Sequence, residues 1–428
     1  MRFILALFVA ALLAGCASAA VPGDTLDRIA RDYVSLSLEI GERDDGYIDA
    51  YYGPAEWREA ARANPRGLPE LAAAAAALQA RVEAIDPAPL EPIVQRRRTF
   101  LIAQLTAART RLRMLQGERL SFADEARGLY GISPEIRPLT DYDPVLARIE
   151  RLVPGSGPLA DRVEAFQQRF TIPADRLDAV MRAAIAECRR RTIAHIPLPE
   201  GESFALEFVT NRSWSGYNWY RGNFHSLIQI NTDHPVRLAR AVDLGCHEGY
   251  PGHHAYNVLL ERELSRGRNW VEFQVYPLYS PLSFIAEGSA NYGVELAFPG
   301  DERLAFETGT LYPLAGLRAE GAPAYLALQE AMQDLSGARF TIARDYLEGR
   351  ITREQAAALA QRYQLMAPAR AAQSIAFVAQ YRAYVINYGL GRDMVAAYIE
   401  RAGPDTEARW TRMKRLLSEP LLCCDWPD

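Results

Sequence analysis

An eight-residue segment at positions 247–254 constrains this chain more than any other, and it reads His-Glu-Gly-Tyr-Pro-Gly-His-His. The segment holds three of the six histidines in 428 residues. Imidazole and carboxylate groups bind zinc, and a glutamate beside a ligand histidine is where metallohydrolases keep their general base. The segment therefore predicts a metal site, with His247 as a ligand and Glu248 as the general base.

The spacing of the histidines departs from the H-E-x-x-H pattern, in which two histidines four residues apart share one helix face. Pro251 occupies the fourth position here. On a regular helix His253 would lie roughly 240° around from His247, and His254 would lie about 10.5 Å further along the axis. Because a proline breaks the helix and Gly252 permits unusual backbone angles, a distorted turn can bring a later histidine back. We prefer His253 as the second ligand, and His254 remains the alternative.

A third ligand is predicted in a later apolar segment, residues 284–292. Glu287 is its acidic residue, and the residues on either side are small or apolar. An ionised carboxylate is costly to bury there without a partner, and a metal ion provides one. Glu295, two turns further on, is the alternative ligand, and a salt-bridged Glu287 is the explanation that needs no metal.

The segments around these residues resemble the DUF885 family, which is related to the gluzincin metallopeptidases. The resemblance is carried by HEGYPGHH, by NWYRGN before it and by FIAEGSANYG after it. DDGYIDAYYGP near the start and QYRAYVINYGLGR near the end extend it over nearly the whole mature chain. It implies a mainly α, multi-helix metallopeptidase-like fold, Zn²⁺ as the cofactor and a third ligand on a later helix. It supplies no substrate.

The same resemblance implies roles for residues outside the metal cluster. Gluzincins commonly use a tyrosine to hydrogen-bond the oxyanion of the tetrahedral intermediate, which indicates Tyr388 or Tyr384. Arg382 is a candidate for binding a substrate carboxylate through both arms of its guanidinium. Gluzincins also pair an edge strand with the substrate backbone, and Asn218 and Tyr220 are the candidate contacts there. The structural alternative for each tyrosine is burial in an amphipathic helix.

The rest of the chain is predicted to be mainly helical, with one small β-hairpin near the active-site cleft. Strand-like alternation at 204–208 and an apolar run at 227–230 predict the two strands of that hairpin. Helical spacing of apolar residues predicts two long helices within the first half of the chain. The stripes comprise Leu26, Ile29, Tyr33, Leu36 and Ile40, and then Leu101, Leu105, Ala108, Leu112 and Leu115.

The mature chain, residues 16–428, is long enough for one large domain. Two lobes around a cleft, at 24–195 and 196–428, are the alternative. The metal helix is expected to begin after residues 232–235, with Asp233 as its N-cap and Pro235 in its first turn. Asp243, one turn before His247, is a candidate partner for the imidazole N–H.

Residues 1–15 read as a lipoprotein signal peptide. A positive start and a short apolar core are followed by Leu-Ala-Gly and Cys16, and the pattern resembles the bacterial lipoprotein box. We predict a lipidated Cys16 and attachment to the bacterial envelope, at the outer membrane and facing the periplasm. An ordinary secretory peptide cut near residues 17–19 is the alternative. Export permits disulfides, but the spacing does not assign pairs among the other four cysteines, Cys188, Cys246, Cys423 and Cys424.

The charge pattern gives no sign of a nucleic-acid partner. The net charge is −5, and both signs are interspersed along the chain. The densest basic run is at residues 96–98, with further arginines at 109, 111 and 113, and it reads as a solvated helix face.

These observations together predict a zinc-dependent hydrolase, a metallopeptidase or amidase acting on peptide-like substrates in the cell envelope. The alternative is a non-catalytic envelope lipoprotein that binds peptide or another ligand and has a structural metal site. A third interpretation is hydrolysis of another envelope polymer. The altered histidine spacing keeps the second alternative open, because a structural site would use four protein ligands. The oligomeric state is not predicted.

Overall fold

The computed structural model describes residues 25–423 and residue 426. The predicted signal peptide, the lipidation site Cys16 and Cys424 lie outside the described residues. Within the described ranges, none of the helices combines the length and the apolar character needed to cross a membrane.

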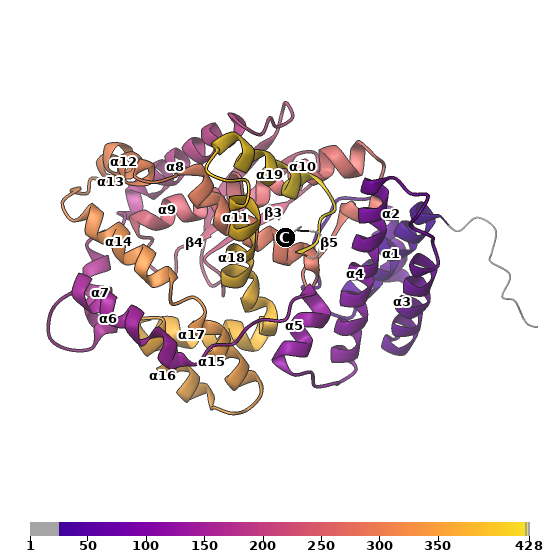
Figure 1. Cartoon of the computed structure of the whole chain (residues 1–428), viewed down its shortest axis with the longest axis horizontal. Coiled ribbons are helices and arrows are strands. Elements are labelled where there is room, and N and C mark those ends of the chain that lie inside the picture. Colours follow the sequence, from indigo (N-terminus) through magenta and orange to yellow (C-terminus); the bar gives the residue numbers. More distant parts are fainter. Residues whose placement is uncertain (1–24, 424–425, 427–428) are drawn as a thin grey trace, which may run out of the picture.

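The chain is mainly α-helical, as predicted, and its first helices stand together at one end of the molecule (Figure 1). They are α1 (Leu26–Gly41), α2 (Ala55–Ala63), α3 (Leu68–Glu83), α4 (Pro92–Leu115) and α5 (Phe122–Tyr130). The predicted stripe of α1 is buried from Leu26 to Ile40, and that of α4 is buried from Leu101 to Leu112. Helical periodicity therefore located both elements correctly.

A second group of helices lies at the opposite end of the molecule (Figure 1). It contains α6 (Asp143–Leu152), α7 (Leu159–Gln168), α14 (Ala322–Gln333), α15 (Ala338–Leu347), α16 (Arg353–Tyr363) and α17 (Pro368–Tyr381). These helices share one apolar cluster that includes Ile149, Leu328 and Ile375. Segments far apart in the sequence thus pack around a single apolar cluster.

The central helices hold the residues predicted to bind metal. They are α8 (Leu177–Ile193), α9 (Leu238–Leu244), α10 (His253–Leu260), α11 (Pro281–Ala297), α18 (Ile386–Glu400) and α19 (Thr406–Ser418), with the short α12 (Glu302–Phe306) and α13 (Tyr312–Ala315) beside them. Helix α11 is buried along almost its whole length. It packs closely on α18, because a Cβ atom on Gly288 would stand only 2.6 Å from the backbone of Gly391. Two glycines therefore let these helices approach.

The strands form two small sheets. The larger has the order β2-β4-β3, with β2 (Ser203–Val209) parallel to β4 (His225–Asn231) and β3 (Gly216–Tyr220) antiparallel to β4. The two predicted strands are present, but they pair in parallel. The hairpin partner of β4 is β3, which comes from the aromatic segment between them. The smaller sheet pairs β1 (Ile48–Tyr51) with β5 (Val275–Pro277).

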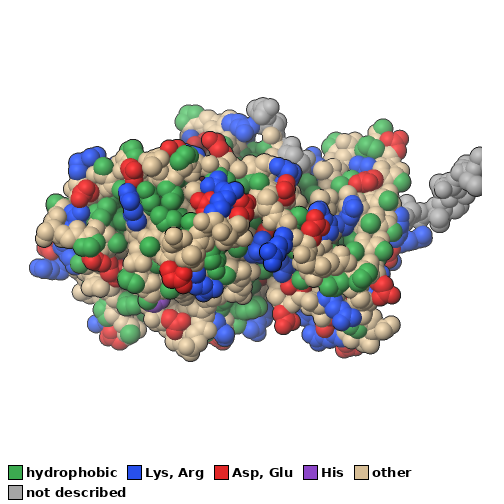
Figure 2. Space-filling view, turned by 90° about the horizontal axis from the view of Figure 1, so that it is seen from below, with side chains coloured by type: hydrophobic (Ala, Val, Ile, Leu, Met, Phe, Trp, Pro, Cys, Tyr) green, Lys and Arg blue, Asp and Glu red, His purple; other side chains and the backbone are tan. Residues whose placement is uncertain are grey.

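The arginines of α4 are not all solvated, which corrects the interpretation of the basic run. Arg97 is buried and pairs with the buried carboxylate of Glu272 at 2.6 Å. Arg111 pairs with Asp44 at the same distance and is largely covered. Arg97 therefore ties α4 to the segment before β5, and Arg111 ties α4 to the loop after α1. On the face shown in Figure 2, basic and acidic side chains are interspersed.

Candidate metal centre

The predicted distortion between His247 and the later histidines is present. Helix α9 runs into a π-helical turn, Gly245–Gly249, and a new helix, α10, begins at His253. Gly252 makes this restart possible, because a Cβ atom there would lie 1.8 Å from the carbonyl oxygen of His247. Its N–H donates to the carbonyl oxygen of Cys246 at 3.0 Å. The regular helical pattern is therefore interrupted between His247 and His253, so the two imidazoles are not held apart as they would be on a continuous helix.

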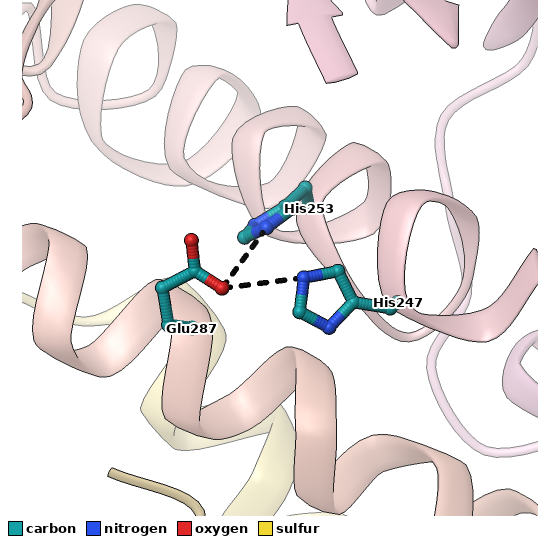
Figure 3. A group of neighbouring side chains, drawn as sticks. All are labelled: His247, His253 and Glu287. Atoms are coloured by element: carbon teal, nitrogen blue, oxygen red, sulfur yellow. Dashed lines mark ion pairs between the residues drawn. The ribbon is translucent and has the colours of Figure 1, made fainter. Parts of the chain in front are cut away.

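This interruption of the helix brings His247 and His253 together opposite Glu287 of α11 (Figure 3). The Nε2 atoms of His247 and His253 lie 3.2 and 3.7 Å from Glu287 Oε2. The two imidazole rings are nearly perpendicular, with centroids 4.6 Å apart. One ligand atom from each of the three side chains lies within 4.8 Å of the others, which is a spacing that one metal ion can bridge.

His254 points away from this group. Its Nδ1 atom lies 2.7 Å from Ser226 Oγ, and its Nε2 atom lies 2.8 Å from Glu202 Oε2. Glu202 also accepts hydrogen bonds from Tyr250 and Arg189. Both nitrogens of this wholly buried imidazole are therefore engaged on the side opposite the cluster. Of the two adjacent histidines, the structure brings only His253 to the other candidate ligands.

The protonation states of His253 and Glu287 suit a cation. Burial lowers the pKa of His253 to about 4, so this imidazole is neutral at pH 7. Burial would raise the pKa of Glu287, but the adjacent imidazoles hold it below its ordinary value. Burial likewise opposes the charged form of His247, and the pKa of His247 is raised because Glu287 and Glu248 are close. A neutral imidazole and an ionised carboxylate are the forms that ligate metals.

An unsatisfied oxygen supports the same conclusion. Glu287 Oε1 accepts a hydrogen bond of 2.7 Å from the hydroxyl of Tyr384, which orients the carboxylate. Glu287 Oε2 is buried and has no hydrogen-bond partner, although both imidazoles face it. A buried carboxylate oxygen without a donor is costly, and a metal ion at this point would satisfy it. The residues present therefore fit a divalent cation.

Glu248 lies beside the cluster and is not part of it. Its side chain is 4% exposed, and its Oε2 atom has no hydrogen-bond partner. Burial raises the pKa of Glu248 to about 7. Asn218 of β3 donates to the carbonyl oxygen of Glu248 at 2.7 Å, which fixes the backbone of the π turn. A buried carboxylate with one free oxygen and a pKa near neutrality is suited to accept and return a proton.

A cavity of about 1770 Å³ opens onto these residues. Its lining includes His247, Glu248, Asn218, Tyr384 and Tyr388. Burial and the nearby charge of Glu287 raise the pKa of Tyr388 well above its ordinary value, so this side chain stays an O–H donor. Of the two tyrosines predicted to contact substrate, Tyr384 is bonded to Glu287, and Tyr388 faces the cavity.

Asp49 also lines the cavity, although no pattern in the sequence predicted a role for it. It lies on β1 at an irregularity in the pairing with β5, between Ile48 and Ala50. Such bulges redirect a side chain, and Asp49 faces the cavity, where the Tyr217 hydroxyl donates to it. Burial raises the pKa of Asp49 to about 7. The one feature of the sequence that could have indicated this role is that Asp49 is an acid in an otherwise apolar and aromatic strand.

Two predicted substrate contacts are engaged elsewhere. Arg382 pairs with the buried Glu125 at 2.8 Å and is not among the residues that line the cavity. Tyr220 donates to the buried carboxylate of Glu261, outside the cavity. Both side chains serve packing, since each satisfies a buried acid.

Three acids with predicted roles around the metal helix have other partners. Asp243 pairs with Arg303 at 2.9 Å instead of contacting His247. Glu295, the alternative third ligand, accepts from Arg392 Nε at 2.8 Å. Asp233 accepts from two backbone N–H groups in the loop before β3, and Arg237 precedes α9 without a side-chain cap.

A disulfide between Cys188 of α8 and Cys246 ties the π turn to a neighbouring helix. Both cysteines are fully buried. Cys246 precedes His247, so the bond fixes the backbone next to a candidate ligand. The fold and the site together define a mainly helical protein with a group of two half-buried histidines and one buried glutamate that is compatible with a metal ion.

Comparisons with known proteins give weak structural similarities. A predicted lipoprotein from Colwellia psychrerythraea matches with 16% identity and a TM-score of 0.49, over 81% of this chain and 66% of that one. A predicted lipoprotein of unknown function from Shewanella oneidensis matches with 13% identity and a TM-score of 0.43, over 85% of this chain and 76% of that one. This chain thus spans less than two thirds of the first of these relatives.

An M32 carboxypeptidase from Deinococcus radiodurans R1 matches with 15% identity and a TM-score of 0.36, over 92% of this chain and 88% of that one. No protein-family model and no curated protein matches the chain. The resemblance to the DUF885 family therefore stays a prediction, and a proposal of function depends on the geometry of the site.

Proposed function

We propose that this protein is a zinc-dependent hydrolase of peptide or amide bonds. The observation that carries the proposal is the convergence of His247, His253 and Glu287 beside the unpartnered carboxylate of Glu248, at the wall of a large cavity. Two histidines and a glutamate are a ligand set of catalytic zinc sites, which leave one position open.

The residues divide into ligands and proton carriers. His247, His253 and Glu287 would hold the ion, and Tyr384 keeps the Glu287 carboxylate in place. When bound, zinc would supply a Lewis acid that polarises the substrate carbonyl and makes water more acidic. Glu248 takes a proton from the attacking water and returns it to the leaving amine. Tyr388 is positioned to donate a hydrogen bond to the carbonyl oxygen as negative charge develops.

The engagement of His254 favours a catalytic site over a purely structural one. A closed site would need a fourth protein ligand, and His254 was the nearest candidate for it. Its two nitrogens face Ser226 and Glu202 instead. Strand β3 lies at the edge of its sheet, pairs only with β4 among the described strands, and lines the cavity with Gly216, Tyr217 and Asn218. This placement supports pairing with an extended peptide.

We further propose that the protein is exported and lipid-anchored through Cys16. The disulfide between Cys188 and Cys246 supports export, because such bonds persist in oxidising compartments. The outer membrane, facing the periplasm, is the location that the signal segment favours. Peptide-like material of the envelope would then be the accessible substrate.

The test separates ligands from the base. His247→Ala, His253→Ala and Glu287→Ala should each lose zinc by elemental analysis, because each removes one of three ligands. Glu248→Gln should keep zinc and lose about 10²- to 10⁴-fold in turnover of a peptide library, as expected for a general base. His234→Ala is the matched control, since it removes an imidazole that lines the same cavity outside the cluster and should keep zinc.

Other outcomes reassign the function. Full turnover in Glu248→Gln, or normal zinc in any of the three alanine variants, would contradict the assignment of that residue. Zinc loss in His254→Gln with retention in His253→Ala would exchange the two histidines. A zinc-loaded protein that binds peptides and cleaves none would instead be the non-catalytic binding protein.

A further inference from the structure

The arginines that line the metal cavity are not equivalent. Eight of them line it: Arg137, Arg148, Arg237, Arg240, Arg303, Arg339, Arg370 and Arg392. Six pair with a carboxylate within 4.0 Å. Among the described residues, Arg339 and Arg370 have no ion pair and no side-chain hydrogen bond. An arginine stays charged in proteins, so these two guanidinium groups present positive charge that no protein carboxylate contacts directly among the described residues.

Arg339 is held in a defined orientation. Its guanidinium carbon lies 5.1 Å from the ring centroid of Phe377 and 5.8 Å from that of Tyr388. Its Nε atom is buried without a hydrogen-bond partner. The aromatic contacts orient the planar group, and the N–H groups at its edge are left for a ligand. Burying such a group without an acceptor is unfavourable, and a bound anion would remove that cost.

Arg339 is also close to the candidate metal centre. Its neighbour Tyr388 packs against Tyr384 with ring centroids 5.8 Å apart, and the Tyr384 hydroxyl donates to Glu287 at 2.7 Å. Two aromatic rings therefore separate the guanidinium from a candidate ligand. An extended peptide advances about 3.5 Å per residue, so about three residues would cover this separation.

Arg370 extends the positive charge along the same wall. Helix α17 presents Arg370, Gln373, Ser374, Phe377 and Tyr381 to the cavity. These positions follow helical spacing, so they form one stripe along one face. Arg370 lies in the first turn of α17, where the helix dipole adds positive potential. This wall of the cavity therefore presents two guanidinium groups, Arg339 and Arg370, to an anion, together with the polar side chains of α17.

We propose that Arg339, assisted by Arg370, binds a carboxylate of the substrate, and that the preferred substrates are peptides with a carboxylate within about three residues of the cleaved bond. The guanidinium fork matches a carboxylate through two parallel hydrogen bonds. The role predicted for Arg382 thus passes to Arg339, because Glu125 occupies Arg382. The identification of the ligand as a peptide rests on the proposed function.

The experiment compares three peptides of equal length on the zinc-loaded mature chain: a tripeptide with a free terminal carboxylate, its C-terminal amide, and an amide that contains one aspartate. Binding is measured by calorimetry in the Glu248→Gln background, where the peptides should stay intact. We expect the free acid or the aspartyl amide to bind at least about tenfold more tightly than the neutral amide, as for a charge-assisted pair. Which acidic peptide binds more tightly identifies the source of the carboxylate.

Arg339→Gln in the same background should reduce this preference to near unity, and Arg370→Gln should reduce it in part. Arg339→Lys keeps the positive charge but loses the two parallel N–H donors of the guanidinium. It should retain part of the preference for acidic peptides, and it controls for misfolding. Arg137→Gln is the matched control, since Arg137 lines the same cavity and already pairs with Asp141. Equal binding of all three peptides, no binding of any of them, or an undiminished preference in Arg339→Gln overturns the inference. If the wild-type protein binds the acidic peptides more tightly but cleaves none of the three, only the proposed hydrolase activity is overturned.

Discussion

At the residue scale, the site depends on where the carboxylate of Glu248 can lie. Gly216 of β3 faces this side chain, and a Cβ atom on Gly216 would stand 2.7 Å from Glu248 Oε1. Leu244 lies at a similar distance from the same point. The absence of a side chain at position 216 therefore leaves the space that Glu248, the proposed general base, occupies.

Gly216→Ala should consequently displace the base while leaving the ligands in place. The atoms that would be hit belong to flexible side chains, so the cost in stability should be small. A misplacement of about 1 Å can cost about 10²-fold in rate, and we expect a loss of that order in turnover. Zinc content and the thermal midpoint should remain close to those of the wild type. Loss of zinc in this variant would mean that β3 supports the ligands rather than the base.

The acid Asp49 makes stability depend on pH. Burial raises its pKa to about 7, from an ordinary value of 3.8. The native state thus holds a proton that the unfolded state has released between these values, so this group lowers the free energy of unfolding as pH rises through the window. Asparagine cannot ionise, so Asp49→Asn should gain stability relative to wild type from pH 4 to pH 7.5. Denaturant titrations of both proteins at several pH values measure the difference. A constant difference would contradict the shifted pKa.

At the scale of elements, the site depends on an interrupted helix. Helix α9, the π turn and α10 together place two imidazoles side by side that a continuous helix would separate. Gly252 lies at the restart, where any side chain would collide with the backbone. The disulfide from α8 to Cys246 holds the first half of this unit, and the network around His254 holds the second.

Gly252→Ala should therefore lose the metal centre. The added Cβ atom would lie 1.8 Å from the carbonyl oxygen of His247, and backbone atoms cannot move aside as a flexible side chain can. We expect zinc affinity to fall by at least 10-fold to 100-fold, because His253 would no longer face His247. Competition with a chromophoric chelator measures it. Gly309→Ala is the control, since a Cβ atom there meets nothing within 4 Å. Normal zinc affinity in Gly252→Ala would show that the turn tolerates a second conformation.

At the scale of the whole molecule, the N-terminal helices complete the site. Strand β1 supplies Asp49 to the cavity, and α5 supplies Glu125, which is 1% exposed. Glu125 accepts from Arg382 Nε at 2.8 Å and from the N–H of Ala383 at 3.1 Å. Tyr384, which orients Glu287, follows directly in the chain. One apolar cluster, which includes residues of α1, α4, α5 and α11, joins these parts.

Breaking this long-range pair should destabilise the fold. Glu125→Ala leaves Arg382 without its acid and the N–H of Ala383 without its acceptor. Arg382 is half-buried, so the larger part of the cost comes from the buried N–H, and we expect a loss of about 2 kcal/mol in the free energy of unfolding. Asp124→Asn is the matched control: its pair with Arg127 is exposed, so it should change stability by about 0.5 kcal/mol or less. Equal effects of the two variants would mean that Glu125 is not required to join the two parts.

Much of the fold could be predicted from local patterns. The stripes of α1 and α4 follow the helical period, and burial of one face is what that period expresses. His247, Glu248 and Glu287 could be predicted as candidates because metal-binding groups stood in segments with few other uses for them, and the fold places all three beside one cavity. The parallel pairing of β2 with β4 could not be predicted, since pairing depends on the chain between them and not on either strand alone.

The sequence by itself determined the helical class, the residues able to hold a metal and the acid beside them, because these follow from residue type and short-range spacing. Only the tertiary structure decided between His253 and His254, since Ser226 and Glu202 come from distant segments to occupy the second imidazole. It also decided that Arg382 is engaged and Arg339 is not. The physical reason is the same in each case: a charged or polar side chain is available for function only if no distant partner satisfies it, and distant partners are chosen by the fold.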